Sequence, residues 1–191
     1  MQELIQTIKV LDEDQLKDVN DYIDTLEFNP AMLPKTDGSS GIDISNRSGL
    51  QLYLEEGIGT KLLHSCMNNA LLEYRKRITE VHEKFNNYPL GFPLQREMLS
   101  VLEYGEGDQY NYHHDQAIFP DKNEYYRKIS LVLYLKKAEQ GGGTSFPHKT
   151  FRPEAGYGLF FPSNWCYPHS GEQVVEGRKR VVVTWYYVNL T

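Results

Sequence analysis

The amino-acid sequence predicts an α+β fold that is mainly β, a β-barrel or jelly roll braced by N-terminal helices. Two observations support this prediction. Apolar residues recur at helical spacing in much of residues 1–92, whereas from residue 93 onward the period is two and glycine-containing turns separate short runs. A chain of 191 residues is long enough for one domain with a sizeable core. We therefore expect a single domain over residues 1–191, with a helical support and flap region at 1–92 and a jelly-roll core at 93–191.

The chain opens with a predicted strand over residues 5–11, followed by a helix. Asp12 is a suitable N-cap, and Gln15, three residues later, can complete a capping box. The apolar stripe of this helix consists of Leu16, Val19, Ile23 and Leu26. We expect the helix to end at residues 29–30, an Asn-Pro pair, because proline disfavours helical geometry before it.

A second, longer helix is predicted from about residue 60 to residue 85. Its apolar stripe comprises Leu63, Met67, Ala70, Leu71, Tyr74, Ile78, Val81 and Phe85. Such a stripe is typical of a helix that packs against a sheet. Residues 34–48, rich in Gly, Ser and Asp, are expected to form a flexible loop or hairpin flap, and residues 117–126 are a second lid candidate.

The second half of the chain reads as strands connected by tight turns. The expected strands are residues 98–104, 110–115, 127–136, 158–161 and 179–188. Glycine-containing turns are expected at residues 105–107, 141–143 and 176–177.

Composition and charge exclude several classes of protein. The net charge of −6 and a pI near 5.5 argue against a protein that holds phosphate backbones, so we expect no nucleic-acid partner. No apolar run is long enough for a membrane span, and the first residues lack the pattern of a secretory signal, so we expect a cytoplasmic protein with no membrane partner. Cys66 and Cys166 are too few for a disulfide framework and are expected to be reduced packing thiols.

Two short stretches carry the chemistry that can be read from the residues. His113 and Asp115 share one face of an extended strand, while His114 points to the other. His169 lies 54 positions after Asp115 and can return to them in a closed sheet. Two histidines and one carboxylate are the ligand set of non-haem Fe(II) oxygenases, and they leave coordination positions open for a cosubstrate and O2. A His-x-Asp pair also arises by chance, so a pair of polar surface residues is the alternative.

The context of this pair resembles a known family. Tyr104, Gly107, Tyr110, His113 and Asp115 match the Y-x-x-G-x-x-Y-x-x-H-x-D signature of the prolyl 4-hydroxylase branch of Fe(II)/2-oxoglutarate dioxygenases. Further motifs follow in the family's order: residues 127–135 resemble R-x-A-T-x-x-x-Y-L with Ser130 where Thr is usual, residues 142–147 G-G-x-T-x-F-P, residues 153–161 P-x-x-G-x-x-L-x-F, and His169, Gly177, Lys179 and Trp185 the motif H-x7-G-x-K/R-x5-W. The resemblance covers roughly the last half of the chain.

The resemblance implies a double-stranded β-helix, the cupin-like jelly roll, with Fe(II) held by His113, Asp115 and His169. It also implies 2-oxoglutarate as cosubstrate, O2 as oxidant and ascorbate as reductant, with hydroxylation of an unactivated C–H bond and release of succinate and CO2. Asp115 keeps the carboxylate that related halogenases replace with a small residue, which favours hydroxylation.

In the resembled family a basic residue meets the far carboxylate of 2-oxoglutarate, and Lys179 occupies that position. Lys179 is accordingly expected to have a catalytic and cofactor-binding role. Its neighbours Arg178 and Arg180 point to the opposite strand face, where we expect them to be solvated surface charges.

Hydroxyl groups complete the expected cosubstrate site. By the same resemblance, Tyr104 and Thr144 would donate hydrogen bonds to the far carboxylate. Tyr134 is the alternative tyrosine, and simple packing in a core strand explains it equally well.

Glu97, Arg127 and Trp185 match positions that the family uses around a peptide substrate. Charged groups can satisfy peptide N–H and C=O groups while the indole offers an apolar face. The alternative is a surface ion pair between Glu97 and Arg127, with Trp185 in the core. We expect the substrate to be a prolyl residue in a peptide or protein.

Two other classes of function stay open at this point. An oxygenase of the same fold could act on a free amino acid, another small molecule or an alkylated base, although a base demethylase would carry a second arginine where this chain has Thr184, Trp185 and Tyr186. The other alternative is a jelly-roll module that binds a metal or ligand without turnover, since fold alone does not establish activity. The sequence does not predict an oligomeric state.

Overall fold

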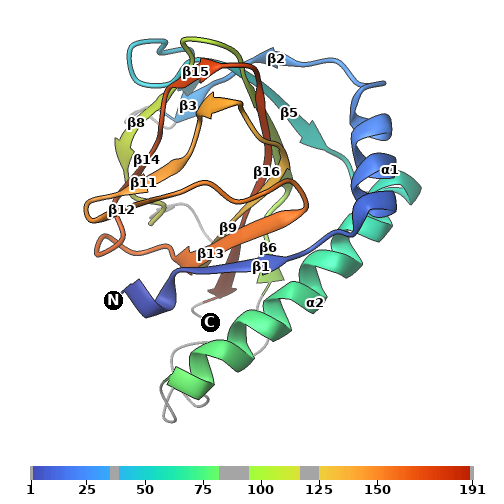
Figure 1. Cartoon of the computed structure of the whole chain (residues 1–191), viewed down its shortest axis with the longest axis vertical. Helices are drawn as coiled ribbons and strands as arrows, with labels where there is room; N and C mark the ends of the chain where they lie inside the picture. The colour runs from blue at the N-terminus through green and yellow to red at the C-terminus, as the bar shows by residue number, and fades with distance from the viewer. Residues whose placement is uncertain (1, 35–38, 82–94, 117–124, 190–191) are drawn as a thin grey trace.

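The computed structural model describes residues 2–34, 39–81, 95–116 and 125–189. It contains a 3-10 turn η1 (Gln2–Leu4) and two helices, α1 (Glu13–Ile23) and α2 (Ile58–Val81), which lie on one side of the strands (Figure 1). Within these described ranges no helix is both long enough and apolar enough to span a membrane. The lid candidate at 117–126 falls largely outside the described residues, as do residues 35–38 of the expected flap and the expected last turn of the second helix.

The larger sheet forms the wall of the fold that faces the helices. Its strands pair in the order β1-β13-β9-β16-β7-β5-β2, and β6 pairs with β16 off this path. The bounds are β1 (Gln6–Lys9), β2 (Asn29–Pro30), β5 (Leu50–Leu54), β6 (Gln95–Arg96), β7 (Leu99–Tyr104), β9 (Tyr125–Lys136), β13 (Tyr157–Pro162) and β16 (Lys179–Asn189). All the pairings are antiparallel. Three strands from the first 54 residues therefore belong to the same sheet as the C-terminal strands.

The second wall is a smaller sheet with the order β12-β11-β14-β8. Its strands are β8 (Tyr110–His113), β11 (Thr144–Phe146), β12 (Lys149–Phe151) and β14 (His169–Gly171). Two short ribbons complete the structure: β10 (Gln140–Gly141) with β15 (Val174–Glu176), and β3 (Leu33–Pro34) with β4 (Ser40–Gly41). Two facing antiparallel sheets are the jelly roll that the sequence predicted, and the mainly β fold class is confirmed.

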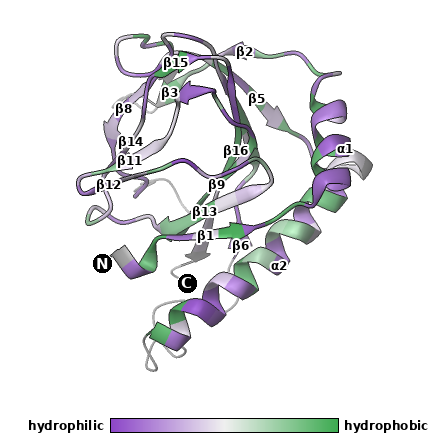
Figure 2. Ribbon diagram, in the orientation of Figure 1, coloured by the Kyte–Doolittle hydropathy of each residue, from purple (hydrophilic) through white to green (hydrophobic). Residues whose placement is uncertain are grey.

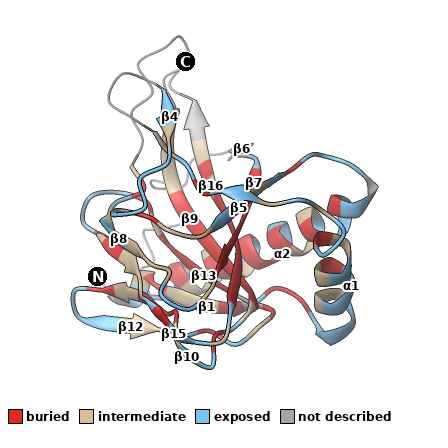
Figure 3. Ribbon diagram, turned by 90° about the horizontal axis from the view of Figure 1, so that it is seen from above, coloured by how far each residue is buried: buried red, intermediate tan, exposed pale blue. Residues whose placement is uncertain are grey.

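Helix α2 closes the outer face of the larger sheet. Figure 2 shows apolar and polar residues interleaved along α2, and its apolar stripe includes the fully buried Leu63, Met67, Tyr74 and Ile78. Tyr74 stacks on Phe160 of β13 with ring centroids 5.2 Å apart. In Figure 3 the central strands β9 and β16 are buried over most of their length, whereas β12 and β4 are exposed or half-buried. The predicted packing of this helix against a sheet is therefore confirmed.

Helix α1 begins as predicted but ends early. Asp12 and Gln15 form a capping box, in which each side chain accepts a hydrogen bond from the other residue's backbone N–H at 2.8 and 3.0 Å. The expected helix end at residues 29–30 is wrong, since α1 ends at Ile23 and the Asn-Pro pair forms β2 against β5. The last helical hydrogen bond runs from the Asp24 N–H to the Asn20 carbonyl. The apolar residue at position 26 favours a longer helix, but the pairing of residues 29–30 with β5 outweighs that local preference.

The expectation that both arginines beside Lys179 are solvated is wrong for Arg180. Its side chain is 6% exposed and bonds Glu103 of β7 and Asp24 after α1, at 2.5 and 2.6 Å respectively. Arg178 is 74% exposed, as expected, and pairs with Glu103 at 3.1 Å. The outer face of β16 lies under α1 at this point, so a charge on that face is buried and needs partners. The spacing of residues along β16 does not reveal that helix α1 covers its outer face.

Candidate active site

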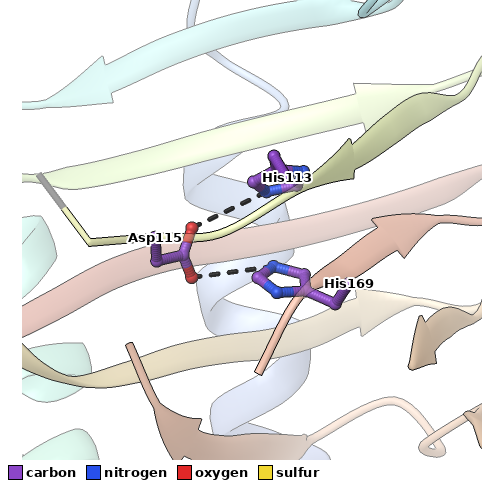
Figure 4. A group of neighbouring side chains, drawn as sticks. All are labelled: His113, Asp115 and His169. Carbon is purple, nitrogen blue, oxygen red and sulfur yellow. Dashed lines mark ion pairs between the residues drawn. The ribbon is translucent and has the colours of Figure 1, made fainter. Parts of the chain in front are cut away.

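The predicted metal ligands come together where the smaller sheet pairs β8 with β14. His113 and His169 are direct partners in the register of these antiparallel strands. Asp115 follows the end of β8, so the expected strand over residues 110–115 is two residues too long, yet its carboxylate still points to the two imidazoles (Figure 4). The three candidate ligand atoms lie within 4.8 Å of one another.

The hydrogen bonds of the imidazoles orient them for metal binding. His113 Nδ1 bonds the backbone carbonyl of Asn111 at 2.8 Å, and His169 Nδ1 bonds that of Tyr167 at 3.1 Å. A carbonyl only accepts, so each Nδ1 carries the proton and each Nε2 presents a lone pair. Each Nε2 lies 3.6 Å from an oxygen of Asp115. These contacts match the donor set and the outer hydrogen bonds of a metal-binding histidine pair, so the residues fit an Fe(II) ion.

The protonation states agree with this fit. Burial lowers the pKa of His113 to about 4, and the neighbouring His169 acts in the same direction. Burial tends to raise the pKa of Asp115, but His169, His113 and the Ser130 hydroxyl together hold it below its usual value. At neutral pH the cluster therefore offers a neutral imidazole from His113 and a carboxylate from Asp115, which are the forms that bind a metal ion.

A pair of buried hydroxyls supports the carboxylate. Ser130 Oγ on β9 donates to Asp115 Oδ2 at 2.6 Å, and Ser163 Oγ lies 2.9 Å from Ser130 Oγ. Both serines are buried. Arg127 Nη1 also donates to the backbone carbonyl of Asp115 at 3.3 Å. The carboxylate is thus held from the side of the larger sheet, with one hydrogen-bonded oxygen and one that faces His113.

The four residues expected around 2-oxoglutarate gather on the inner face of the barrel. Lys179 pairs with Tyr104 in the β16–β7 register, and its Nζ lies 5.4 Å from the Tyr104 ring centroid and 5.1 Å from that of Tyr134. The Tyr134 and Thr144 hydroxyls are 2.7 Å apart. All four side chains are buried. This corner therefore combines one cation with hydroxyl groups, which is suitable chemistry for a carboxylate.

Lys179 is an unusual feature of this corner because no carboxylate within the described residues lies within ion-pair distance of its ammonium. Burial lowers the pKa of Lys179 to about 8, and the more distant Glu172 acts against this shift. Glu172 itself is engaged by Arg152 Nη2 at 2.6 and 2.7 Å. A buried ammonium without a close counter-ion is costly in the free protein and favours the binding of an anion.

The three residues expected around a substrate also meet. Arg127 Nε and Nη2 donate to the two carboxylate oxygens of Glu97 at 2.5 and 2.6 Å. The guanidinium lies over the indole of Trp185, with its Cζ 3.7 Å from the ring centroid. The ion pair considered as the alternative is therefore present, but both partners and Trp185 also line the cavity that contains the metal ligands.

One cavity of about 560 Å³ connects these groups. Its lining includes nine of the ten site residues singled out from the sequence: Glu97, Tyr104, His113, Asp115, Arg127, Thr144, His169, Lys179 and Trp185. Tyr134 is not among the lining residues and reaches the cavity through its hydrogen bond to Thr144. The volume is in the range of about 300–1,000 Å³ that small-molecule sites occupy.

The sequence analysis missed residues that the fold brings to the site. Tyr110 stacks on His113 with centroids 3.8 Å apart, Ser163 extends the hydrogen-bond chain to Asp115, and Arg47 enters the cavity from the segment before β5. The sequence motif includes Tyr110, but it does not show that the tyrosine ring stacks on His113. For Ser163 and Arg47 no local pattern in the sequence signals a neighbour more than 30 positions away.

The cavity, the His-Asp-His cluster and the buried lysine together define the class of an iron- and 2-oxoglutarate-dependent oxygenase. In agreement with this class, residues 99–187 match the model of the 2OG-Fe(II) oxygenase superfamily. This part of the chain is a 2OG-Fe(II) oxygenase domain, and the protein is a 2-oxoglutarate-dependent dioxygenase. The predicted family resemblance and the dependence on Fe(II), 2-oxoglutarate and O2 are thus confirmed, and a module without turnover is not supported.

Solved prolyl hydroxylase structures share the fold. The viral collagen prolyl hydroxylase of Paramecium Bursaria Chlorella virus-1, solved with 2OG, is 20% identical with a TM-score of 0.63, over 97% of this chain and 96% of that chain. A Pseudomonas putida prolyl-4-hydroxylase is 19% identical with a TM-score of 0.63, over 95% and 91%. A Trichoplax adhaerens prolyl hydroxylase, in complex with a hypoxia inducible factor peptide fragment, is 17% identical with a TM-score of 0.68, over 97% and 84%. No curated protein sequence gives a significant match.

Proposed function

We propose that this dioxygenase hydroxylates a prolyl residue in a peptide or protein, with release of succinate and CO2. The observation that carries the proposal is the arrangement of the Arg127–Glu97 pair and the Trp185 ring in the same cavity as the metal ligands. A flat apolar ring beside paired polar groups suits a pyrrolidine ring flanked by peptide groups. The shared fold with the chlorella virus, Pseudomonas and Trichoplax prolyl hydroxylases supports the same substrate class.

In this proposal His113, Asp115 and His169 would hold the iron, and a set of three protein ligands would leave coordination positions for the cosubstrate and O2. Iron and 2-oxoglutarate, when bound there, would supply the activation of O2, with one oxygen atom going to the substrate carbon and the other to succinate. Ser130 fixes the Asp115 carboxylate, and the carbonyl groups of Asn111 and Tyr167 fix the imidazole tautomers.

The role proposed for Lys179 is to bind the far carboxylate of 2-oxoglutarate in the protonated state. Tyr134, Thr144 and Tyr104 supply hydroxyl donors around it. An ammonium with no close counter-ion gains one when the dicarboxylate binds, so the cost of its burial is offset only in the complex.

Ascorbate is the proposed reductant in turnover. The cytoplasmic location and the absence of nucleic-acid and membrane partners stay predictions from the sequence.

The test is succinate formation by the purified protein with Fe(II), ascorbate and 2-oxoglutarate, with and without proline-rich peptides, together with a mass-spectrometric search for one added oxygen on the peptide. We expect peptide-stimulated turnover and hydroxyproline, both absent in His113→Ala. Lys61→Gln, an exposed change on α2, is the matched control and keeps the wild-type rate. Turnover of 2-oxoglutarate that ignores every peptide would contradict the prolyl proposal and favour a small-molecule substrate.

A further inference from the structure

Arg47 is a buried cation at the active site that the proposed function does not use. It precedes β5, and its backbone is fixed by hydrogen bonds from Arg47 N to the Asp43 carbonyl at 2.8 Å and from Ser48 N to the Gln109 carbonyl at 3.1 Å. Its residue surface is 8% exposed, and it lines the same cavity as the metal ligands. Arg47 is therefore a buried residue of the cavity wall whose backbone segment is held by hydrogen bonds.

Two of the three guanidinium nitrogens of Arg47, Nε and Nη2, are buried without a hydrogen-bond partner within the part of the chain that the structure describes. Its Cζ lies 5.1 Å from the ring centroid of Tyr110, which in turn stacks on His113. Burial raises the pKa of Tyr104, and the charge of Arg47 and a side-chain hydrogen bond from it act against that shift, so Arg47 also faces the Tyr104 hydroxyl. Aromatic rings compensate a buried guanidinium only in part.

The carboxylates that line the cavity are already engaged. Glu97 is held by two hydrogen bonds from Arg127, and Asp115 by Ser130 and the two imidazoles. No other Asp or Glu lies in the lining of the cavity among the described residues. An arginine cannot lose its proton at any relevant pH, so an external anion is the group that can pair with Arg47.

The formal charges of the loaded site show that 2-oxoglutarate alone does not balance the cavity. Arg47 and Lys179 together with Fe(II) bring four positive charges, while Asp115 and the 2-oxoglutarate dianion bring three negative ones. The Arg127–Glu97 pair is neutral. One positive charge is left over in a buried site, where an uncompensated charge is unfavourable.

We propose that Arg47 binds a carboxylate of the substrate, so that the preferred prolyl residue carries an acidic group beside it. The inference rests on the proposed function. The carboxylate is either the C-terminal carboxylate of a terminal proline or the side chain of an adjacent Asp or Glu. The two donors Nε and Nη2 are the pair that a guanidinium offers to a carboxylate in bidentate geometry. Lys179 and Thr144 bind the far carboxylate of 2-oxoglutarate, and Arg47 binds the carboxylate of the substrate.

The test compares matched peptides that differ in one charge. One pair places Asp or Asn next to the proline, and the other ends in proline as the free acid or the amide; the ratio of kcat/KM within each pair is measured by formation of hydroxyproline. We expect wild-type protein to prefer the acidic member of at least one pair by about 10- to 100-fold, the usual effect of a charged hydrogen bond. The pair that shows the preference identifies the source of the carboxylate.

Two variants and a control connect this preference to Arg47. Arg47→Gln should reduce the preference to below about threefold, whereas Arg47→Lys, which keeps the charge but loses the two-donor fork, should keep a preference between that of Arg47→Gln and that of wild type. Arg178→Gln removes an exposed positive charge at the surface and should keep the full preference. Circular dichroism of each variant checks that the fold is intact, and the Lys variant keeps the test valid if the Gln variant unfolds.

A binding measurement separates failure of this inference from failure of the proposed function. N-acetyl-L-proline and its amide are titrated into protein loaded with Mn(II) and 2-oxoglutarate, which needs no turnover. If no peptide is hydroxylated but wild type binds the acid at least tenfold more tightly than the amide, and Arg47→Gln does not, the anion site stands and the prolyl hydroxylase proposal fails. Equal affinity for acid and amide in wild type, or a preference that Arg47→Gln retains, would overturn the inference. The inference would also be overturned if Arg47→Gln weakened the binding of 2-oxoglutarate and left the binding of N-acetyl-L-proline unchanged.

Discussion

Replacing Lys179 by Met should stabilise the ligand-free protein and at the same time abolish its affinity for 2-oxoglutarate. Methionine has a similar length and no charge, so it can fill the same space among Tyr104, Tyr134 and Thr144. The two effects have one cause, because the ammonium that is costly to bury in the free protein is the group that the dicarboxylate needs.

The size of the stabilisation follows from the pKa of Lys179. Burial lowers it from 10.5 to about 8, and this shift corresponds to about 3 kcal/mol. Below pH 8 the folded protein holds a charged lysine at that full cost. Between pH 8 and pH 10.5 the unfolded chain binds a proton that the folded protein has lost, so stability rises with pH and the cost fades. The gain from Lys179→Met should therefore be about 3 kcal/mol at pH 7 and about 1 kcal/mol at pH 10.

Urea denaturation of the metal-free protein at both pH values measures the gain, which also corresponds to a Tm roughly 5–10 °C higher at pH 7. Titration of 2-oxoglutarate into Mn(II)-loaded protein measures the other effect, and Lys179→Met should weaken binding by roughly 100-fold or more. Lys179→Arg is the control that keeps the charge. In wild type the affinity should fall by up to tenfold per pH unit above pH 8, because binding must then be accompanied by proton uptake at Lys179.

Two results would refute this reasoning. A Lys179→Met protein that is no more stable than wild type at pH 7 would mean that the buried ammonium has a counter-ion in the free state. A stabilisation of the same size at pH 7 and pH 10 would mean that packing and not charge is responsible.

Further predictions concern the groups around the site. Ser130→Ala should weaken the affinity for Co(II), measured by titration of its visible absorption, by roughly 10-fold, whereas Ser130→Thr should restore it; equal affinity for all three would show that the hydroxyl does not orient the carboxylate. Arg180→Met should lower the free energy of unfolding by roughly 3–5 kcal/mol in urea, because Glu103 loses its buried partner, while Arg178→Met should cost below about 1 kcal/mol; similar losses would contradict the difference in burial. Asp12→Ala should cost about 1 kcal/mol through the lost N-cap of α1, and an unchanged urea midpoint would contradict that.

The sequence predicted best those elements whose signals are local. The strands β7, β9, β13 and β16 and the start of α1 follow from period-two patterns and a capping box, and the structure confirms them. The metal cluster was predicted from a two-residue spacing plus a distant histidine in a family motif, and the structure brings the three side chains together.

Features that depend on tertiary contacts could not be predicted from the sequence. The strand β5 was not expected, because its short pattern of Leu50–Leu54 follows a Gly- and Ser-rich segment and gains its partners only from β7 and β2. Arg180 was assigned to solvent, because no local pattern shows that α1 covers that face of β16. Arg47 was not recognised as a cavity residue for the same reason.

The side-chain contacts between β7 and β16 fix the register of these two strands. Lys179 lies opposite Tyr104 and faces the cavity, while the next pair, Arg180 opposite Glu103, faces outward and is tied to Asp24. A slip of one residue would send the lysine outward, bring the arginine inward, and break the outer ion pairs. Asp24, directly after helix α1, thereby helps to set which of two adjacent cations faces the cavity. A variant that is to carry an arginine in the cavity at this point of β16 must therefore change position 179 and leave Arg180 untouched.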